Sequence, residues 1–390
     1  MGSRESMLGP VLCVVGARPN YMKMAPLLRA FAAEQGMPRA ILVHTGQHYD
    51  YALNDRLFVD LQLPAPDINL EVGSATHAVQ TAEVMKRFEP VVDEMRPSAV
   101  LVVGDVNSTL ACSLVAAKKS VAVIHVEAGL RSYDRAMPEE INRVLTDQIA
   151  DLMYTTERAA QGNLEREGID IGQIVFVGNL MIDSLRAALP RAIAPEQTLA
   201  RENVSFPELS EGAGFGVVTL HRPSNVDDPA TLRAVLDILC DVSQRLTLVW
   251  PMHPRTRAAI DRNGLGGLLA TSRVIAIQPQ GYLEMVGLLN RATVVLTDSG
   301  GVQEEATALG LPCLTMRENT ERPITVEQGT NTVVGRHRAR ALECVEEILR
   351  TGGKRGRVPE LWDGHTAERI AAELASWLGA APRYGTGTRG

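Results

Sequence analysis

Short apolar runs alternate with amphipathic segments along the chain. Continuous apolar runs stand at 11–15, 40–43, 99–103, 121–126, 152–155 and 174–177, and helix-like patterns at 24–34, 76–95 and 108–117 lie between the earlier ones. Strands that are buried on both faces show such unbroken runs, whereas one-sided strands alternate. Because parallel strands need crossover connections, this order predicts a parallel sheet with helices on both sides.

The pattern is interrupted once and then begins again. Residues 185–214 contain several prolines and glycines and no convincing strand, which indicates surface helix and linker. A second series of apolar runs follows at 216–219, 246–250, 274–277, 293–297 and 313–316. The sequence therefore predicts the α/β class, with two doubly wound domains of similar size joined near residue 180. Ligands of such sheets bind beyond the carboxyl ends of the strands, so functional residues are expected there.

Composition and charge narrow the class of protein without identifying a function. Of the 390 residues, 45% are hydrophobic and 22% are charged, as in an ordinary globular protein. The net charge is −7, so no basic excess indicates a nucleic-acid or membrane-surface partner. No apolar run approaches the roughly 18 residues that a membrane span requires.

The cysteines and histidines indicate neither disulfides nor a metal site. Five cysteines, an odd number, are scattered and lie mostly within apolar runs, which is typical of reduced thiols in a cytoplasmic protein. No pair of histidines or cysteines stands at the spacing of metal ligands, so we expect no dedicated metal.

The segment after the first predicted strand has two cations but lacks a dinucleotide fingerprint. It contains a single glycine, Gly16, where the fingerprint needs three, and this argues against an NAD-dependent epimerase or dehydrogenase. Arg18 and Lys23 stand near the start of the following helix and could reach an anion. The alternative is that both are solvated surface charges.

Three carboxylates follow strands or open a helix in the first predicted domain. Asp105 follows 99–103, Glu127 follows 121–126, and Glu139 lies at the start of a later helix. A turn role for Asp105, with Ser108 as a helix N-cap, and dipole compensation by Glu139 are the alternatives. Glu127 follows a run of apolar residues, so its carboxylate must be paired or have a raised pKa. Three carboxylates at one sheet edge exceed what capping requires.

The second predicted domain has a histidine at the end of its first strand. His221 follows 216–219 beside Arg222, where it could act as a general acid or donate to a phosphate. A structural hydrogen-bonding role is the alternative. His253, after the next strand, is interpreted as structural.

A glycine-rich turn in the second half predicts a diphosphate site. Residues 297–306 read TDSGGVQEEA, so a strand ends and a helix begins around Ser299, Gly300 and Gly301. Free N–H groups and the dipole at such a helix start favour a diphosphate. Glu305, one turn into the helix, could accept hydrogen bonds from ribose hydroxyls. A plain strand–helix turn would explain the glycines but not the neighbouring charges.

Cations after the last predicted strand accompany this turn. Arg317 and Arg322 follow 313–316 and lie close in sequence to the glycine-rich helix. The residues together predict a nucleotide-linked substrate, held by the second domain, with the carboxylates of the first domain facing it across a cleft. They do not identify the reaction.

Several longer motifs carry a resemblance to a known family. GARPNYMKMAPL, TGQH, GDVNSTLA, HVEAGLRS, MPEEINR, TDSGGVQEEA, LGLPCLTMR and TERP, in order from about residue 11 onward, resemble the non-hydrolysing UDP-N-acetylglucosamine 2-epimerase family. The resemblance runs to the last helix near residue 371. It implies the glycosyltransferase-B architecture, two Rossmann-like domains with the active site in the interdomain cleft. It places one domain at 8–180, completed by a helix at 365–380, and the other at 181–364.

The resemblance also implies a mechanism and the residues that carry it out. UDP is eliminated to give a 2-acetamidoglucal and then adds back, because loss of the anomeric oxygen acidifies the proton at C2. No cofactor is required, in agreement with the missing fingerprint. The residues that align with the catalytic acid/base set are Asp105, Glu127, Glu139 and His221, and which carboxylate is the base stays open.

The resemblance further implies a UDP site and a cellular setting. A cytoplasmic homodimer that serves cell-surface polysaccharide synthesis is expected from the family, with no nucleic-acid or membrane partner. The residues that align with UDP-binding positions are Arg18, Lys23, Gln280, Ser299, Gly300, Gly301, Glu305 and Arg322.

Other activities stay open at this point. A close relative epimerises UDP-2,3-diacetamido-glucuronic acid and shares several of the motifs, although Arg322-Pro323 favours the plain N-acetylglucosamine enzyme. A glycosyltransferase of the same architecture would not need the clustered carboxylates and would not exchange the C2 proton. A nucleotide-sugar sensor would bind UDP without turnover.

Two departures from the family pattern predict simple kinetics. Many bacterial members have His-Arg-Arg-Glu where this chain has His221-Arg222-Pro223-Ser224. They also have a Gln at the position of Asp50. The resemblance assigns these positions to an allosteric substrate site. We therefore expect hyperbolic initial-rate curves in both directions. A sigmoidal curve, or an absolute need for added UDP-N-acetylglucosamine in the reverse direction, would contradict this prediction.

Overall fold

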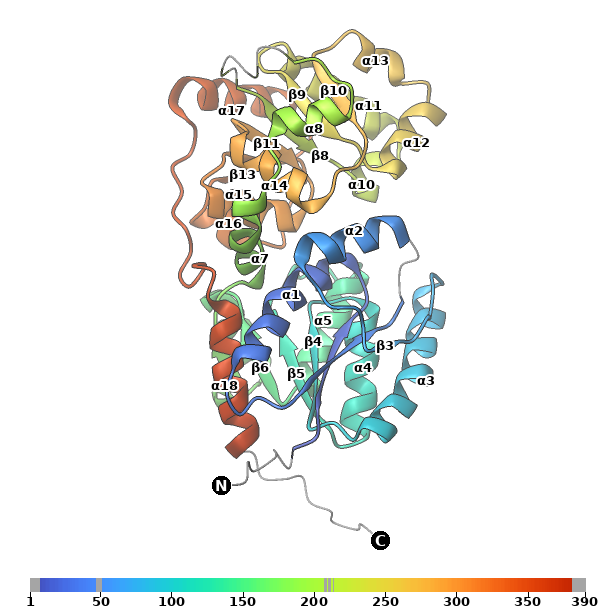
Figure 1. Cartoon of the computed structure of the whole chain (residues 1–390). Helices are drawn as coiled ribbons and strands as arrows, with labels where there is room; N and C mark the ends of the chain where they lie inside the picture. Colours follow the sequence, from blue (N-terminus) through green and yellow to red (C-terminus); the bar gives the residue numbers. More distant parts are fainter. Residues whose placement is uncertain (1–7, 47–50, 207–208, 210–211, 213, 381–390) are drawn as a thin grey trace. The chain divides into compact units, whose positions relative to one another are not determined.

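The computed structural model describes residues 8–46, 51–206, 209, 212 and 214–380, with no side-chain detail at 51–55. The chain divides into two compact units, drawn together in Figure 1. The first contains the described residues up to Ser184 and those from Glu360 onward, and the second is Leu185–Pro359. Each unit contains its own parallel sheet.

The first unit is built on a seven-stranded parallel sheet in the order β3-β2-β1-β4-β5-β6-β7. Its order reverses between β1 and β4, the point at which doubly wound sheets bind ligands. The strands are β1 (Val11–Val15), β2 (Ala40–His44), β3 (Ile68–Asn69), β4 (Ala99–Val103), β5 (Ala122–Val126), β6 (Leu152–Thr155) and β7 (Ile174–Phe176).

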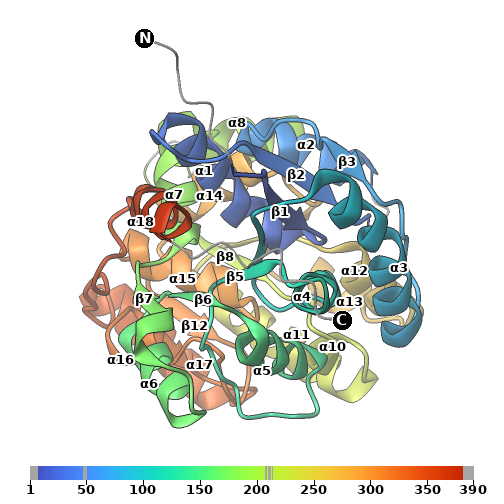
Figure 2. The same ribbon diagram turned by 90° about the horizontal axis from the view of Figure 1, so that it is seen from below.

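Helices cover both faces of this sheet. Figure 2 shows α1 and α18 on one side of the strands and α3, α4 and α5 on the other. The last helix returns from the far end of the sequence to pack against α1. The helices are α1 (Arg18–Ala33), α2 (Tyr51–Leu61), α3 (His77–Met95), α4 (Asn107–Lys118), α5 (Pro138–Ile149), α6 (Arg158–Arg166), the short η1 (Ile171–Gln173), α7 (Leu180–Ala188, which runs into the second unit) and α18 (Thr366–Ala380).

The second unit repeats the plan with six parallel strands in the order β10-β9-β8-β11-β12-β13. The order reverses between β8 and β11. The strands are β8 (Gly216–Thr219), β9 (Leu248–Pro251), β10 (Val274–Ile277), β11 (Val294–Thr297), β12 (Cys313–Thr315) and β13 (Asn331–Val333). The helices are η2 (Leu189–Arg191), α8 (Pro195–Arg201), α10 (Pro223–Val226), α11 (Pro229–Ser243), α12 (Pro254–Arg262), α13 (Gly266–Ala270), α14 (Tyr282–Arg291), α15 (Gly300–Leu309), α16 (Pro323–Glu327) and α17 (Arg338–Thr351).

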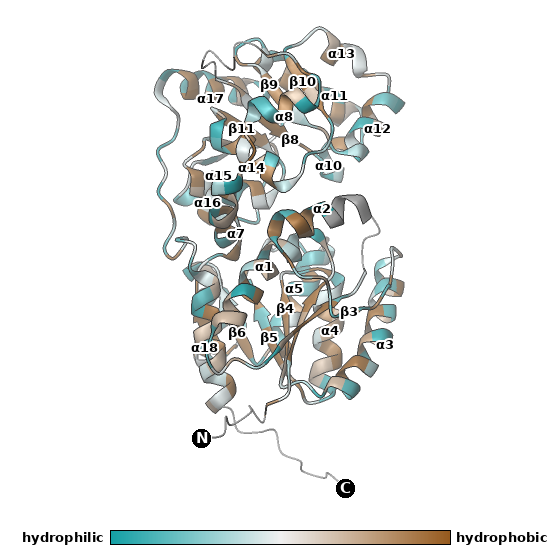
Figure 3. Cartoon of the chain, viewed as in Figure 1, coloured by the Kyte–Doolittle hydropathy of each residue, from teal (hydrophilic) through white to brown (hydrophobic). Residues whose placement is uncertain are grey.

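The apolar runs form the interior of each unit. The strands of both sheets are predominantly brown in Figure 3, whereas the helices carry teal residues as well. All five residues of β1, β4 and β5 are buried. Burying each valine, leucine or isoleucine side chain among them contributes about 1.5–3 kcal/mol, so the sheets hold the turns at their carboxyl ends in fixed positions.

The fold class predicted from the sequence, two doubly wound α/β domains, is confirmed. Two short edge strands, β3 and β13, were not predicted because two or three residues of mixed polarity give no apolar run. The interpretation of Ser108 as an N-cap is wrong. Helix α4 begins one residue earlier with Val106 at its N-cap, so Ser108 lies inside the helix, where its buried hydroxyl contacts the Thr45 hydroxyl at 2.7 Å.

Within the described ranges, no helix is both long enough and apolar enough to cross a membrane.

A buried carboxylate anchors the returning helix α18 to α7. Asp183 of α7 accepts a hydrogen bond of 2.7 Å from the Ala367 N–H, in the first turn of α18. Burial raises the pKa of Asp183 to about 6. The folded protein therefore binds this proton more tightly than the unfolded chain does.

We predict that Asp183 makes the stability of the protein depend on pH, and that replacing its carboxyl with the amide of asparagine removes this dependence. Asp183→Asn keeps an acceptor for Ala367 but cannot ionise. We expect the free energy of unfolding of wild type, minus that of the variant, to fall as pH rises from about 4 to about 6 and then level off. Urea unfolding at several pH values measures it, with the exposed capping residue Asp170→Asn as control. A pH-independent difference would contradict the assignment.

Candidate active site

The switch point of the first sheet is fastened by one buried asparagine. Asn20, in the first turn of α1, accepts from the N–H groups of Gly16 and Ala17, both at 3.0 Å. Its amide donates to the carbonyl of Val103, the last residue of β4, at 2.9 Å. The turn after β1 and the end of β4 are thus held together where strand order reverses.

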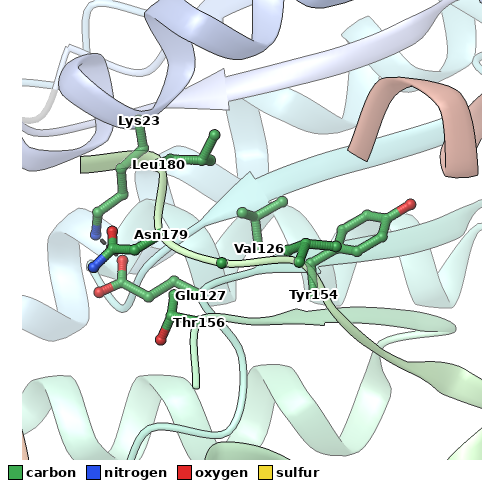
Figure 4. Close-up of a pocket in the computed structure, with 9 residues that line it drawn as sticks. Lys23, Val126, Glu127, Tyr154, Thr156, Asn179 and Leu180 are labelled. Carbon is green, nitrogen blue, oxygen red and sulfur yellow. Dashed lines mark ion pairs between the residues drawn. The ribbon is translucent and has the colours of Figure 1, made fainter. Parts of the chain in front are cut away.

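Lys23 and Glu127 form a buried ion pair at this edge of the sheet. Their side chains are 8% and 7% exposed. Figure 4 shows the ammonium and the carboxylate pointing toward each other, with the Asn179 side chain beside them. The pair lines a small pocket together with residues that follow β6 and β7, among them Thr156, Gly178 and Asn179. The sequence predicted that the Glu127 carboxylate is either paired or has a raised pKa, and in the structure it is paired with Lys23.

The backbone at Glu127 is held in an unusual conformation. Its φ is +70°, in the left-handed region, and the N–H groups of Glu127 and Ala128 both donate to the carbonyl of Tyr154 at 3.0 Å. The Tyr154 side chain extends away from the pocket, and its hydroxyl donates to Glu373 of α18 (Figure 4). Strained backbone of this kind is stabilised by its surroundings and clusters at functional sites.

Asp105 is paired as well, with an arginine of α5. Its carboxylate meets the Arg143 guanidinium, while the Asn142 amide donates to the Asp105 carbonyl at 2.9 Å. Arg143 also bonds Glu140 at 3.0 Å, and Glu140 accepts from the N–H groups of Ser132 and Tyr133, both at 2.9 Å. One face of α5 therefore fixes both Asp105 and the loop before the helix.

Gly104, the residue before Asp105, packs against the Lys23–Glu127 pair. Its φ is +69°, and a Cβ at this position would lie 3.4 Å from Lys23 Nζ and 3.6 Å from Glu127 Oε2. The residue directly before Asp105 thus rests against the Lys23–Glu127 pair. A side chain here would adopt a strained backbone conformation.

The remaining predicted residues of the first unit lie at helix starts. Glu139 is in the first turn of α5 and is partly exposed, and Arg18 is the exposed first residue of α1. Among the described residues, the Glu139 carboxylate has neither a hydrogen bond nor an ion pair. Of the TGQH motif, Gln47 and His48 lie outside the described residues, and so does Asp50.

In the second unit, Asp298 organises the switch point. This fully buried carboxylate follows β11 and accepts from the His221 N–H at 3.0 Å, the Arg222 N–H at 2.9 Å and the Asn225 amide at 3.1 Å. The His221 ring also approaches it, with Nδ1 3.4 Å from Oδ1. A carboxylate behind Nδ1 leaves Nε2 of a histidine for a ligand, as in catalytic acid–base pairs.

The start of α15 has the geometry of an anion site. Ser299 is its N-cap but makes no capping hydrogen bond with its side chain, and the first helical bond runs from the Gln303 N–H to the Ser299 carbonyl at 3.3 Å. The N–H groups of the first turn and the helix dipole therefore face outward. Arg322 lies against this end, since a Cβ on Gly300 would be 3.8 Å from its side chain.

Arginines surround a buried glutamate beside this helix end. Glu321 lies 2.9 Å from Arg317 and 3.9 Å from Arg222. Burial alone would raise the pKa of Glu321, but the charges of Arg322, Arg222 and Arg317 lower it below its ordinary value. Arg322 also bonds Glu304 of α15 at 2.8 Å. The cluster combines excess positive charge with fixed side chains, as binding of a diphosphate requires.

Glu305 lies deeper in α15, bonded to a tyrosine. Its carboxyl accepts from the Tyr282 hydroxyl at 3.0 Å. Burial, with a smaller contribution from the Glu304 charge, raises the pKa of Glu305 to about 7. Gln280, two residues before Tyr282, donates to Glu202 at 3.0 Å.

The structure gathers most of the predicted residues into two groups, one in each unit. Lys23, Asp105 and Glu127 share the edge of the first sheet. In the second unit, His221, Ser299, Gly300, Gly301 and Arg322 lie at the ends of β8 and β11 and the start of α15. Within the described part of the chain, no cluster of histidine, cysteine, aspartate and glutamate residues could hold a metal ion.

Sequence reasoning missed the residues that position these groups. Asn20, Asn142, Arg143 and Asp298 are buried and bonded to candidate site residues or to the turns that carry them. Of these four, Asp298 had the clearest signal in the sequence, because it comes soon after a buried strand, as Asp105 does.

Comparison with known proteins gives a consistent result. Residues 32–375 match the family model described as UDP-N-acetylglucosamine 2-epimerase. The chain is 40% identical to the UDP-2,3-diacetamido-2,3-dideoxy-D-glucuronate 2-epimerase of Pseudomonas aeruginosa, over 94% of this chain and 99% of that protein. It is 39% identical to the UDP-N-acetylglucosamine 2-epimerase of Methanocaldococcus jannaschii, over 93% and 97%.

Solved structures agree with the sequence relatives. The M. jannaschii UDP-GlcNAc 2-epimerase in complex with UDP-GlcNAc and UDP superposes with a TM-score of 0.84 at 37% identity, covering 94% of this chain and 99% of that one. The Neisseria meningitidis enzyme bound to UDP-GlcNAc also gives 0.84, at 27% identity, covering 94% and 100%.

The Lys23–Glu127 pair predicts strong thermodynamic coupling. Lys23→Met removes the ammonium from a buried carboxylate and should lower the free energy of unfolding by about 3–5 kcal/mol. Adding Glu127→Gln to this variant should restore a large part of the loss, because the charge left behind is then removed. Urea unfolding of wild type, both single variants and the double variant completes the cycle. Purely additive effects would contradict the pairing.

Proposed function

The chain belongs to the UDP-N-acetylglucosamine 2-epimerase family, and we propose that it interconverts UDP-N-acetylglucosamine and UDP-N-acetylmannosamine. The observation that carries the proposal is a set of two cation-paired carboxylates at one sheet edge, the buried Glu127 and the partly exposed Asp105. An epimerase needs a base on one face of C2 and an acid on the other. A glycosyltransferase or a sensor does not need this arrangement.

The reaction balances without any cofactor. The C1–O bond to UDP breaks while a carboxylate takes the proton from C2, and the electron pair of the C2–H bond forms the double bond of 2-acetamidoglucal. In the second half of the reaction, a proton is delivered to the opposite face of C2. A diphosphate oxygen of UDP then bonds to C1 again, which gives the epimer.

The second unit supplies the groups that stabilise the leaving diphosphate. The outward N–H groups of Gly300 and Gly301 and the guanidinium of Arg322 are suited to charge that grows as the C1–O bond breaks. His221, oriented by Asp298, donates from Nε2 to the same group. Ser299 contributes a hydroxyl at the same helix start.

The nucleoside end of the substrate is assigned to a neighbouring part of the second unit. Glu305 accepts hydrogen bonds from the ribose hydroxyls, and Gln280 lies in the segment that leads into Tyr282, the hydrogen-bond partner of Glu305. The raised pKa of Glu305 fits this role. Two ribose hydroxyls that donate hydrogen bonds to the buried carboxyl favour its ionised form when substrate is bound.

The first unit performs the proton transfers. Asp105 and Glu127 are held beside Arg143 and Lys23, which fixes the orientation of their carboxyl groups. Glu139, partly exposed on α5, completes the set from which the acid and the base are drawn. Lys23 and Arg18 add positive charge at the start of α1.

The alternative substrate differs by a carboxylate at C6 and a second acetamido group. The chain is 40% identical to a 2-epimerase of the diacetamido-glucuronate and 39% identical to a 2-epimerase of UDP-N-acetylglucosamine. Sequence identity therefore does not distinguish the two substrates. The observation that favours the neutral sugar is the pairing of Lys23 with Glu127 and of Arg143 with Asp105, since these buried cations already balance a carboxylate each. A uronate would place a further negative charge beside them.

The proposal also covers assembly and cellular setting. A cytoplasmic homodimer that supplies cell-surface polysaccharide synthesis is supported by the family resemblance. Five free thiols among the described residues agree with a reducing compartment.

Proton NMR in heavy water tests the reaction directly. We expect UDP-N-acetylglucosamine to give the manno epimer with deuterium at C2, because the abstracted proton exchanges with solvent. Free N-acetylmannosamine and UDP as the only products would indicate a hydrolase. Turnover of UDP-2,3-diacetamido-glucuronate alone would establish the alternative, and UDP binding without exchange at C2 in either sugar would contradict an epimerase.

A further inference from the structure

A fully buried histidine lies directly behind the two carboxylates. His125 of β5 is two residues before Glu127, and none of its surface is exposed. Its Nδ1 lies 2.6 Å from Oδ1 of Asp147 on α5, and its Nε2 lies 2.8 Å from the carbonyl oxygen of Gly104. Both partners only accept hydrogen bonds, so both ring nitrogens must donate. The ring therefore carries two protons and a positive charge.

The charges around His125 are compatible with a cationic ring. Asp147 also bonds Arg131 at 2.7 Å, and Arg131 bonds Glu167 at 2.6 Å. Burial alone would raise the pKa of Asp147, but His125 and Arg131 lower it below its ordinary value, so this carboxyl is ionised. With a cationic ring the row His125–Asp147–Arg131–Glu167 is neutral as a whole, and Glu167, at its outer end, is 29% exposed.

The row is attached to both loops that carry the candidate catalytic carboxylates. At one end His125 holds the carbonyl of Gly104, the residue before Asp105. In the middle, Asp147 accepts from the Gly129 N–H at 3.1 Å, two residues after Glu127. The loops after β4 and β5 are neighbours in the sheet, and the row fixes their separation through two charged hydrogen bonds.

We propose that His125 is a positioning residue that, by donating from both ring nitrogens, sets Asp105 and Glu127 at the spacing needed for proton transfer at C2. The inference rests on the proposed function and adds to it. It also explains the motif HVEAGLRS, whose first, third, fifth and seventh residues are His125, Glu127, Gly129 and Arg131. Glu127 carries chemistry, His125 and Arg131 belong to the row behind it, and Gly129 donates its N–H to Asp147 of that row.

The inference predicts that a substitution of His125 acts on kcat and not on substrate binding. His125→Phe fills the volume but donates to neither partner, so the Gly104 carbonyl and the Asp147 carboxylate lose their hydrogen bond. Displacement of a catalytic group by about 1 Å costs about 10²-fold in rate. We therefore expect kcat to fall by about that factor while KM for UDP-N-acetylglucosamine changes less than about twofold.

A second variant separates the hydrogen bond from simple packing. In His125→Gln the amide nitrogen takes the place of Nε2 and can donate to Gly104, and we expect it to recover most of kcat. Val92→Ala, a buried α3 residue outside the site, serves as the control for lost stability, with kcat per folded molecule unchanged. If His125→Phe has wild-type kcat, or if Gln recovers nothing over Phe, the positioning role is overturned.

The protonation state is tested independently of activity. In the full-length enzyme labelled with ¹⁵N-histidine, we expect one ring, absent from His125→Gln, to show both nitrogens protonated at the pH of the activity assay. A ring with a single N–H would overturn the inference even if epimerisation proceeds. If wild type leaves UDP-N-acetylglucosamine unchanged while the doubly protonated ring is seen, the proposed substrate fails and the buried cation stands.

Discussion

A carboxylate can be buried at the edge of a sheet only if a cation compensates its charge, and the first unit is organised around this requirement. Glu127 is matched by Lys23 and Asp105 by Arg143. Such pairs add little stability compared with apolar residues of similar size. We propose that they serve the proton transfers of an epimerase, which needs oriented carboxyl groups on the two faces of C2.

The parallel sheets make this arrangement possible. Their apolar strands place the turns after β1, β4 and β5 side by side, so residues far apart in sequence share one edge. Helix α5 then supplies Arg143 and Asp147 from a single face, which joins the two carboxylate loops to the same rigid element. In the second unit the same topology brings His221 to Asp298 and the start of α15 to Arg322.

The sequence predicted the framework better than the contacts within it. Long apolar runs located the strands of both sheets, and the position of Glu127 after such a run indicated a buried, paired carboxylate. The partner could not be found in the same way, because Arg143 and Asp147 lie in an amphipathic helix where charged residues usually face water. Only the three-dimensional register of α5 against β4 and β5 shows that they point inward.

Helix boundaries and edge strands had the weakest signal. Ser108 has the properties of an N-cap, yet the helix starts one residue before it, and its hydroxyl is used within the interior instead. Strand β13 contains Asn331 and Thr332 and stands next to β12 at the end of the described strand order. Propensity alone does not predict such a segment, since the neighbouring strand provides its stability.

The central claim is that the two paired carboxylates of the first sheet edge transfer the proton at C2. The most direct measurement is the rate of deuterium incorporation at C2 of UDP-N-acetylglucosamine by the variant Asp105→Asn/Glu127→Gln, with UDP affinity measured on the same sample. The account predicts a loss of about 10²–10⁴-fold in exchange, with UDP still bound by the second unit. Exchange at the wild-type rate would contradict it.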